Sequence, residues 1–242
     1  MRDALDDELA AASEQGSRNW FDVRIGRFTS SEMHRLIKSG TRLMTADELK
    51  NRPKSGPGSS AKLTEDPSKF SDDGETYIYQ KVAETLTGEI RVSGYSNATA
   101  HGEDMEPLAA EYFIQKTGYS HEIVAFVPVG EHAGGSPDRY VNGDEILEIK
   151  CPYDPTNQVK YLMLTDQWDL KRQYPEHYWQ CMSNLLFTGK KLCHFVTYDH
   201  RFTEEKYKLS WIKITPHPGD MDIISVKLAA AVRLKLEILK SL

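Results

Sequence analysis

The stretch that most constrains this chain runs from Gly134 to Pro152 and reads GGSPDRYVNGDEILEIKCP. Its Asn142-Gly143 dipeptide is typical of a tight two-residue turn between antiparallel strands. Side chains alternate along the strand that follows the turn, so that Ile146, Glu148 and Lys150 face one way and Leu147, Ile149 and Cys151 the other. The sequence therefore predicts a β-hairpin with one apolar face and one face that carries two opposite charges.

A third charged side chain belongs to this hairpin, because Asp138 stands at the end of the preceding extended run. The turn brings Asp138 back toward Glu148 and Lys150. A Mg²⁺ site needs one or two carboxylates, with water and phosphate oxygens completing the coordination, and Asp138 with Glu148 meets that need. Taken alone, a Glu-x-Lys pair on a strand is more often a weak surface ion pair, and that alternative stays open here.

The composition is that of a soluble globular protein, and 242 residues are enough to bury a sizeable core. Lys and Arg number 30 against 36 Asp and Glu, so any surface that binds nucleic acid must be local. Cys151, Cys181 and Cys193 lack metal-ligand spacing and predict reduced thiols. No apolar run reaches the roughly 18 residues of a membrane span, and the acidic start lacks a signal-peptide pattern. We therefore expect a cytoplasmic protein without membrane contact.

A locally basic segment lies near the start of the chain. Arg24 and Arg27 precede a predicted helix over residues 31–37, which Thr29 or Ser30 can cap. A helix N-terminus with hydroxyl groups and free backbone N–H groups can bind phosphate, and nearby arginines strengthen such a site. The alternative is an ordinary capped helix with surface arginines.

The rest of the chain is predicted from its periodicity and its turn residues. Residues 1–18 form a peripheral extension, and residues 19–242 form a single domain. Apolar periodicity predicts further helices over 75–86, 175–188 and 220–242 and strands over 120–129, 191–198 and 206–214. The Ser-, Gly- and Pro-rich residues 39–75 lack such periodicity and are expected to form a long mobile loop.

Another helix opens within residues 100–107 and ends at Thr117, before Gly118. Pro107 fits an early position of this helix. The acids around it, including Glu106, are explained most simply by the preference of carboxylates for a helix N-terminus.

The motifs resemble one known family. Pro137-Asp138 followed by Glu148-Ile149-Lys150 resembles the PD-(D/E)xK nuclease signature, and the surrounding Ser-Pro-Asp and Leu-Glu-Ile-Lys-Cys-Pro are similar to the lambda-exonuclease (YqaJ-type) viral recombinases. The segment from Trp20 through Arg24 and Gly26 to Ser31 is similar to the same family. Gly102-x-x-x-Glu106 matches a further motif of its members. These motifs span roughly residues 20–201 in matching order.

The resemblance implies a metal-binding active site. Asp138 would bridge two Mg²⁺ ions, with Mn²⁺ as the substitute. Glu148 and the carbonyl of Ile149 would complete one site, and Glu106 would contribute to the other. Lys150 would orient the attacking water or help to deprotonate it.

The resemblance also implies a site for the end of the DNA. Arg24 and Ser31 would bind a 5′-phosphate, and Gln180, on the helix after the Glu-x-Lys strand, would face the active site. Met182 replaces a second glutamine that some relatives have at this point.

For the whole protein, the resemblance implies a restriction-endonuclease-like α/β (α+β) fold with a mixed central sheet flanked by helices. The implied activity is 5′-to-3′ digestion of one strand of linear duplex DNA, which leaves a 3′ single-stranded tail for phage-type recombination. Implied partners are a single-strand annealing protein and two further copies of the chain in a homotrimer, in the cytoplasm of a bacterium that carries a phage or prophage. Two alternatives stay open, namely an endonuclease of the same fold and a non-catalytic scaffold that binds DNA ends.

Overall fold

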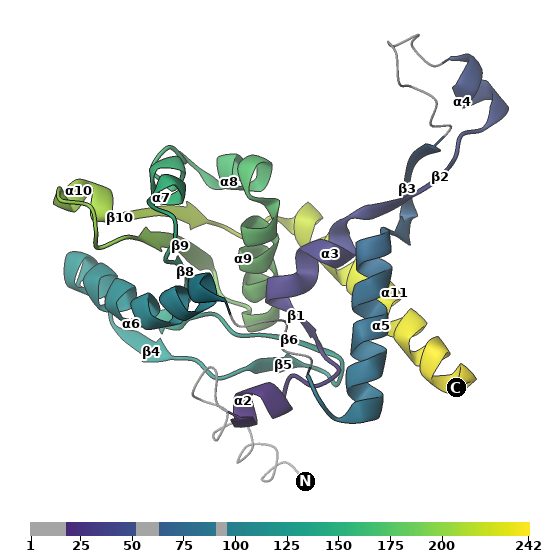
Figure 1. The fold of residues 1–242 in the computed structure, drawn as a ribbon, viewed down its shortest axis with the longest axis horizontal. Coiled ribbons are helices and arrows are strands. Elements are labelled where there is room, and N and C mark those ends of the chain that lie inside the picture. Colours follow the sequence, from purple (N-terminus) through teal and green to yellow (C-terminus); the bar gives the residue numbers. More distant parts are fainter. Residues whose placement is uncertain (1–17, 52–62, 91–95) are drawn as a thin grey trace.

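The computed structural model describes residues 18–51, 63–90 and 96–242 (Figure 1). Its helical elements, in chain order, are α2 (Arg18–Asp22), the 3₁₀ turn η1 (Ser30–Glu32), α3 (Met33–Ile37), α4 (Ala46–Lys50), α5 (Asp72–Thr87), α6 (Asn97–Thr117), α7 (Pro155–Tyr161), α8 (Gln167–Gln173), α9 (Pro175–Thr188), α10 (Glu205–Lys208) and α11 (Pro218–Ser241). Its strands are β1 (Phe28–Thr29), β2 (Ser39–Leu43), β3 (Leu63–Phe70), β4 (His121–Ile123), β5 (Val127–Val129), β6 (Ala133–Gly135), β7 (Arg139–Val141), β8 (Glu145–Lys150), β9 (Leu192–Tyr198) and β10 (Leu209–Ile214).

The central sheet has the strand order β10-β9-β8-β7-β4 (Figure 1). β8 and β9 run parallel, and the other neighbours in this sheet run antiparallel. The parallel pair is joined by a crossover that contains α7, α8 and α9, as parallel strands require. The predicted class, an α/β fold with a mixed sheet flanked by helices, is confirmed.

The predicted hairpin is formed by β7 and β8, with Arg139 opposite Leu147 and Val141 opposite Glu145. The connection between the paired residues Val141 and Glu145 has three residues, Asn142, Gly143 and Asp144, so the predicted two-residue turn is one residue too short. Asn142 and Gly143 have the positive φ values, 49° and 76°, for which an Asn-Gly pair is suited.

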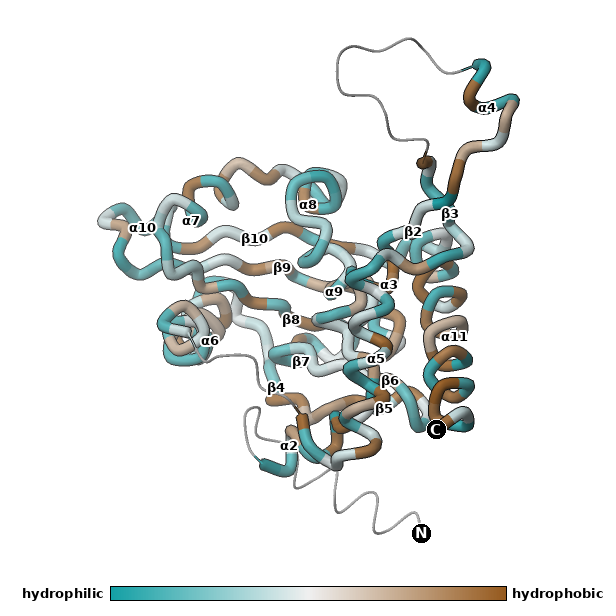
Figure 2. Tube along the Cα trace, turned by 45° about the vertical axis from the view of Figure 1, so that its right-hand side comes forward, coloured by the Kyte–Doolittle hydropathy of each residue, from teal (hydrophilic) through white to brown (hydrophobic). Residues whose placement is uncertain are grey.

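The two faces of β8 pack against different helices, as alternation predicted. Leu147 and Ile149 lie in a cluster with Ala109 and Phe113 of α6. Ile146 lies in the larger cluster on the opposite face, which is built mainly from α3, α5, α9 and α11. Figure 2 shows hydrophobic residues along the central strands, between the surrounding helices. Glu148 therefore sits inside a sheet that is covered on both sides.

A smaller sheet, in the order β1-β6-β5, joins the N-terminal segment to the region just before the hairpin. β1 runs parallel to β6, with Phe28 opposite Ala133 and Thr29 opposite Gly134. This pairing brings the segment of Arg24 and Ser31 close to the segment that leads into Asp138.

The prediction of a loop over residues 39–75 is wrong for residues 39–51 and 63–75, which the structure describes. β2 and β3 form an antiparallel pair, α4 follows β2, and α5 begins at Asp72. Figure 1 shows this pair projecting from the body of the molecule, with α4 toward its far end. Residues 52–62, and the predicted N-terminal extension up to residue 17, lie outside the described residues.

Two further expectations need correction. α6 begins at Asn97, after the N-cap Ser96, so Pro107 lies in the interior of the helix. Glu106 is therefore too far from the N-terminus to be explained by the helix dipole, which acts within the first turn. The single strand expected over 120–129 is two strands, and β4 and β5 belong to different sheets.

The predicted C-terminal helix is present as α11, which packs against α5, α3 and α9. No helix among residues 18–51, 63–90 and 96–242 combines the length and the apolar character needed to cross a bilayer.

Candidate active site

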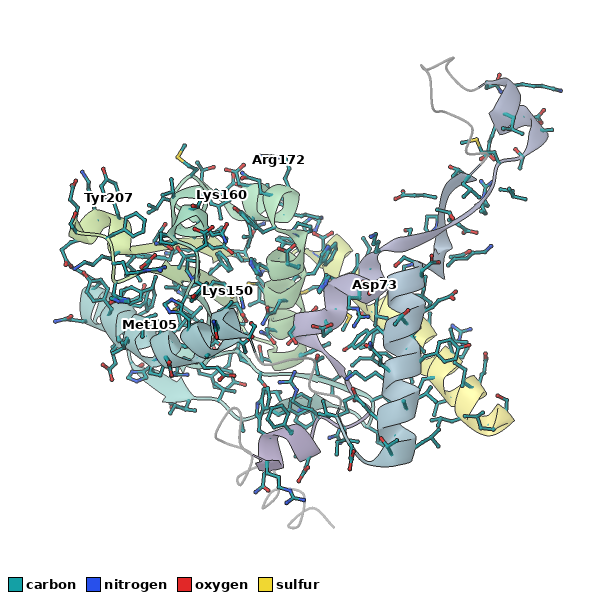
Figure 3. The ribbon with its side chains drawn as sticks, in the orientation of Figure 1. Asp73, Met105, Lys150, Lys160, Arg172 and Tyr207 are labelled. Carbon is teal, nitrogen blue, oxygen red and sulfur yellow. The ribbon has the colours of Figure 1, made fainter. Side chains whose placement is uncertain are left out.

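One cavity of about 520 Å³ contains every residue that the family resemblance assigned to the site, whereas Arg27 of the predicted phosphate site does not line it. These are Arg24, Ser31, Glu106, Asp138, Glu148, Ile149, Lys150 and Gln180. They come from the N-terminal segment, α6, the hairpin and α9. Figure 3 labels Lys150 in the central part of the molecule, beside α6.

Asp138 is fixed at the open end of the hairpin by two hydrogen bonds to β8. Its backbone N–H donates to the carbonyl of Leu147 (3.1 Å), and its Oδ2 accepts from the N–H of Ile149 (2.6 Å). The register of the hairpin thus decides where this carboxylate lies relative to Glu148.

Glu148 is 1% exposed and is bound on both carboxylate oxygens. Its Oε1 accepts from Nζ of Lys150 (2.6 Å), and its Oε2 accepts from Nδ2 of Asn184 (3.1 Å). Nζ of Lys150 also donates to Oε1 of Gln180 (3.3 Å). Two side chains of α9 therefore hold the charged pair of β8 in place.

Glu106 reaches the cavity from α6 and accepts a hydrogen bond from Nη1 of Arg139 (3.1 Å). Arg139 follows Asp138 in the hairpin, so the hairpin also holds the carboxylate of Glu106 through this hydrogen bond. The sequence did not single out Arg139, although its position next to Asp138 was visible.

Burial and mutual repulsion dominate the electrostatics of these carboxylates. Burial, with the added charge of Asp138, raises the pKa of Glu106 to about 7. Burial also raises the pKa of Glu148 to about 8, with Lys150 opposing the shift and Asp138 adding to it. Burial alone would lower the pKa of Lys150, but the carboxylates of Glu148 and Asp138 outweigh it and raise that pKa. Lys150 is therefore a protonated cation in this arrangement.

The residues present fit a divalent metal by the chemistry of their donors. Within the described ranges, no three His, Cys, Asp or Glu side chains are already gathered closely enough to hold a metal ion. Even so, Glu106, Asp138 and Glu148 line one cavity together with Ile149. They are the hard oxygen donors that Mg²⁺ prefers, and a divalent cation would offset the repulsion that raises two of their pKa values.

The same cavity also carries Arg24 and Ser31. The guanidinium of Arg24 lies over the ring of Trp20, 3.8 Å from its centroid, and Nε1 of Trp20 donates to Oγ of Ser136 (3.2 Å). Burial lowers the pKa of Arg24 to about 10. The charges of Tyr77, Glu32 and Glu84 oppose that shift, and among the described residues no carboxylate forms a salt bridge with Arg24.

The predicted cap of the helix after Arg27 takes a different form. Ser30–Glu32 is a 3₁₀ turn that leads into the short α3, and Thr29 makes no side-chain capping bond. Its Oγ1 lies 3.2 Å from Oγ of Ser31 instead. The phosphate cradle expected at a helix N-terminus is therefore replaced by side chains that line the cavity.

Two residues of α9, His177 and Asn184, were not predicted from the sequence. His177 lines the cavity, and its Nε2 lies 3.0 Å from the hydroxyl of Tyr161. Burial lowers the pKa of His177 to about 3, so the ring is neutral. His177, Gln180 and Asn184 stand at positions i, i+3 and i+7, the spacing of one helix face. That polar stripe on an otherwise apolar helix was a signal in the sequence.

Comparisons with known proteins agree with this architecture. LHK-Exo, an alkaline exonuclease from Laribacter hongkongensis, is 20% identical and has a TM-score of 0.69, and the match covers 93% of this chain and 95% of that one. The structure of LHK-Exo in complex with dAMP gives a TM-score of 0.70 at the same identity and coverage. A phage-related exonuclease from Haemophilus somnus 129PT is 14% identical, with a TM-score of 0.61 and coverage of 89% and 96%.

These likenesses, at low identity, show a shared fold. Among curated protein sequences, none matches this chain significantly. The family model for the YqaJ-like viral recombinase domain matches residues 19–191, which include every residue that lines the cavity. This chain belongs to the family of YqaJ-like viral recombinase domains.

Proposed function

We propose that this protein is a Mg²⁺-dependent exonuclease that digests one strand of linear duplex DNA from its 5′ end. Membership in a viral recombinase family and a fold shared with alkaline exonucleases support a nuclease that serves recombination. The proposal depends on one observation, that Arg24 lines the same cavity as Asp138, Glu148 and Lys150. The digestion would leave 3′ single-stranded tails.

The carboxylates of Asp138 and Glu148, the carbonyl of Ile149 and the carboxylate of Glu106 would hold two Mg²⁺ ions, or Mn²⁺ in their place. Bound there, the ions would neutralise charge on the phosphodiester and lower the pKa of the attacking water. Raised carboxyl pKa values mean that this site binds cations more strongly as the pH rises.

Lys150 acts in this proposal as a cation rather than as a base. The carboxylates of Glu148 and Asp138 keep its ammonium protonated, and the amide of Gln180 helps to fix its direction. A fixed positive charge stabilises the negative charge that develops on the phosphate oxygens in the transition state. It can also donate a hydrogen bond that orients the attacking water.

Arg24 and Ser31 supply the direction of digestion. A terminal 5′-phosphate bound to Arg24 would place a nearby phosphodiester at the carboxylates, because both groups line one cavity. The structural neighbour in complex with dAMP holds a mononucleotide, which agrees with release of mononucleotides from this cavity. By family resemblance we also propose a homotrimer, a single-strand annealing partner and a cytoplasmic location.

Covalently closed plasmid and the same plasmid made linear test this proposal. With Mg²⁺, we expect the linear form to be degraded and the closed form to stay intact, and we expect EDTA to stop the reaction. Cutting of the closed form would instead favour an endonuclease of the same fold. Binding of linear ends without Mg²⁺-dependent release of nucleotides would favour a non-catalytic scaffold.

A further inference from the structure

Three of the buried charged residues outside the cavity form one cluster and have no part in the chemistry described above. Lys81 and Glu84 of α5 are 6% and 7% exposed, and Lys235 of α11 is 3% exposed. Ionised groups are costly to bury unless they are paired and hydrogen-bonded. The hydrogen-bond partners of these three side chains therefore indicate why they are buried.

Glu84 and Lys235 bind the backbone of Gly26, and Lys81 binds Glu84. The N–H of Gly26 donates to Oε2 of Glu84 (2.9 Å), and the carbonyl of Gly26 accepts from Nζ of Lys235 (2.6 Å). Nζ of Lys81 binds both oxygens of Glu84, at 2.8 and 2.9 Å. Two helices thus hold both polar groups of one residue.

Gly26 belongs to a tight turn that begins at Arg24. The N–H of Arg27 donates to the carbonyl of Arg24 (3.0 Å), and Gly26 has a φ of +68° at the third position of this turn. A Cβ on Gly26 would lie 2.4 Å from Oγ1 of Thr85. The turn therefore packs directly against α5, with no room for a side chain between them.

The charge of this cluster also favours an anion nearby. Two ammonium groups, of Lys81 and Lys235, face one carboxylate, of Glu84. Burial lowers the pKa of both lysines, and Glu84 opposes that shift. With both lysines protonated, the cluster leaves one excess positive charge behind the turn that carries Arg24.

We propose that Lys235 is a positioning residue, which acts through the Gly26 backbone to hold Arg24 against the cavity. The Lys81–Glu84 pair acts on the N–H of the same glycine. The inference rests on the proposed binding of a 5′-phosphate by Arg24. It assigns a function in end recognition to residues of α5 and α11 that do not line the cavity.

The same helix offers a matched control in Lys227. It is 8% exposed, and its Nζ donates to the carbonyls of Pro67 (2.8 Å) and Lys69 (3.1 Å) in β3. It stands eight residues, about two helical turns, before Lys235. The two lysines share burial and the type of bond, and they differ in the segment that they hold.

The experiment compares the parent protein with Lys235→Met and Lys227→Met, as full-length chains with saturating Mg²⁺. Initial rates are measured over a range of concentrations of linear duplex with 5′-phosphate or 5′-hydroxyl ends. For Lys235→Met we expect the apparent KM for phosphorylated ends to rise roughly tenfold, equivalent to about 1.4 kcal/mol. We expect kcat to change little and hydroxyl ends to be unaffected, so that the preference for phosphate is lost. Lys227→Met should keep the preference of the parent.

The outcomes separate this inference from the proposed function. If the parent prefers phosphorylated ends and Lys235→Met keeps that preference, the inference alone is overturned. An equal loss of the preference in Lys235→Met and Lys227→Met would also overturn it. A parent with no preference would overturn phosphate reading by Arg24 and the inference with it. If Lys235→Met does not fold, by circular dichroism, Gly26→Ala displaces the turn while keeping every charge, and we expect the same loss of preference. Retention of the preference in folded Gly26→Ala would also overturn the inference.

Discussion

Asn184 donates a hydrogen bond from Nδ2 to Oε2 of Glu148 across 3.1 Å, although the two residues are 36 positions apart. Asn184 has no exposed surface, and Glu148 has almost none. The amide therefore sets the direction of a carboxylate that Lys150 binds from the other side. In metal sites, partners of this kind orient the ligands and tune their affinity.

Asn184→Leu should weaken metal binding and slow cleavage, each about 10- to 100-fold, because Glu148 loses its second partner. The measurement is a Mg²⁺ titration of the cleavage rate. Ser183→Ala is the control, since Ser183 is the buried neighbour on α9 and its hydroxyl has no hydrogen-bond partner within the described residues. Equal Mg²⁺ requirements in the parent and in Asn184→Leu would contradict the role given to Asn184.

Lys150→Met should reduce the rate of cleavage by about 100-fold or more, because a fixed cation is removed from the transition state. The fold should persist, since Glu148 can take up a proton and lose its unpaired charge. Single-turnover cleavage at saturating Mg²⁺ measures the first effect and circular dichroism checks the second. Lys160→Met, in the exposed part of α7, should behave like the parent. Unchanged cleavage by Lys150→Met would remove Lys150 from the mechanism.

The pKa values of Glu106 and Glu148 predict how the metal-free protein responds to pH. Burial raises them to about 7 and about 8, above the values of an unfolded chain. Protonation of these two carboxyl groups therefore stabilises the folded state. This stabilisation is complete below about pH 4.3 and is lost as the pH rises through 7 to 8.

Thermal unfolding without metal should thus occur at lower temperature at pH 8.5 than at pH 6, and Mg²⁺ should stabilise the protein more at the higher pH. The Mg²⁺ concentration that gives half-maximal cleavage should fall over the same range, because the ligands must be deprotonated. A Mg²⁺ requirement that is the same at both pH values would contradict this assignment.

Arg24→Gln should remove the preference for a 5′-phosphate while leaving cleavage of hydroxyl ends near the parental rate. The reason is that Arg24 lines the cavity but, among the described residues, forms no salt bridge with its carboxylates. The ratio of initial rates on the two kinds of end measures the effect. Arg233→Gln, on the exposed side of α11, is the control, and an undiminished ratio in Arg24→Gln would exclude Arg24 from end recognition.

The hairpin and α9 could be predicted because their signals are local. An Asn-Gly turn, strict alternation in β8 and helical periodicity over residues 175–188 fix these elements without reference to the rest of the chain. β2 and β3 could not be predicted in the same way, because this projecting pair buries little on either face and so lacks apolar alternation.

The site shows the same division. Asp138, Glu148 and Lys150 are marked by a motif, but the pairing of Thr29 with Gly134 joins distant segments whose register no local pattern encodes. Asn184 was missed because its partner lies on another element. From the sequence, Glu106 was explained by a helix that begins within residues 100–107. In the structure this helix begins at Asn97, so that explanation does not hold.

The central claim is that the cavity cuts DNA progressively from a 5′ end with Mg²⁺. Linear duplex labelled at the 5′ end or at the 3′ end of the same strand tests it most directly. The account predicts that labelled mononucleotide appears at once from the 5′ label, that the 3′ label stays in a long strand, and that Asp138→Ala abolishes the release of the 5′ label. Early release of the 3′ label, or Mg²⁺-dependent release that persists in Asp138→Ala, would contradict it.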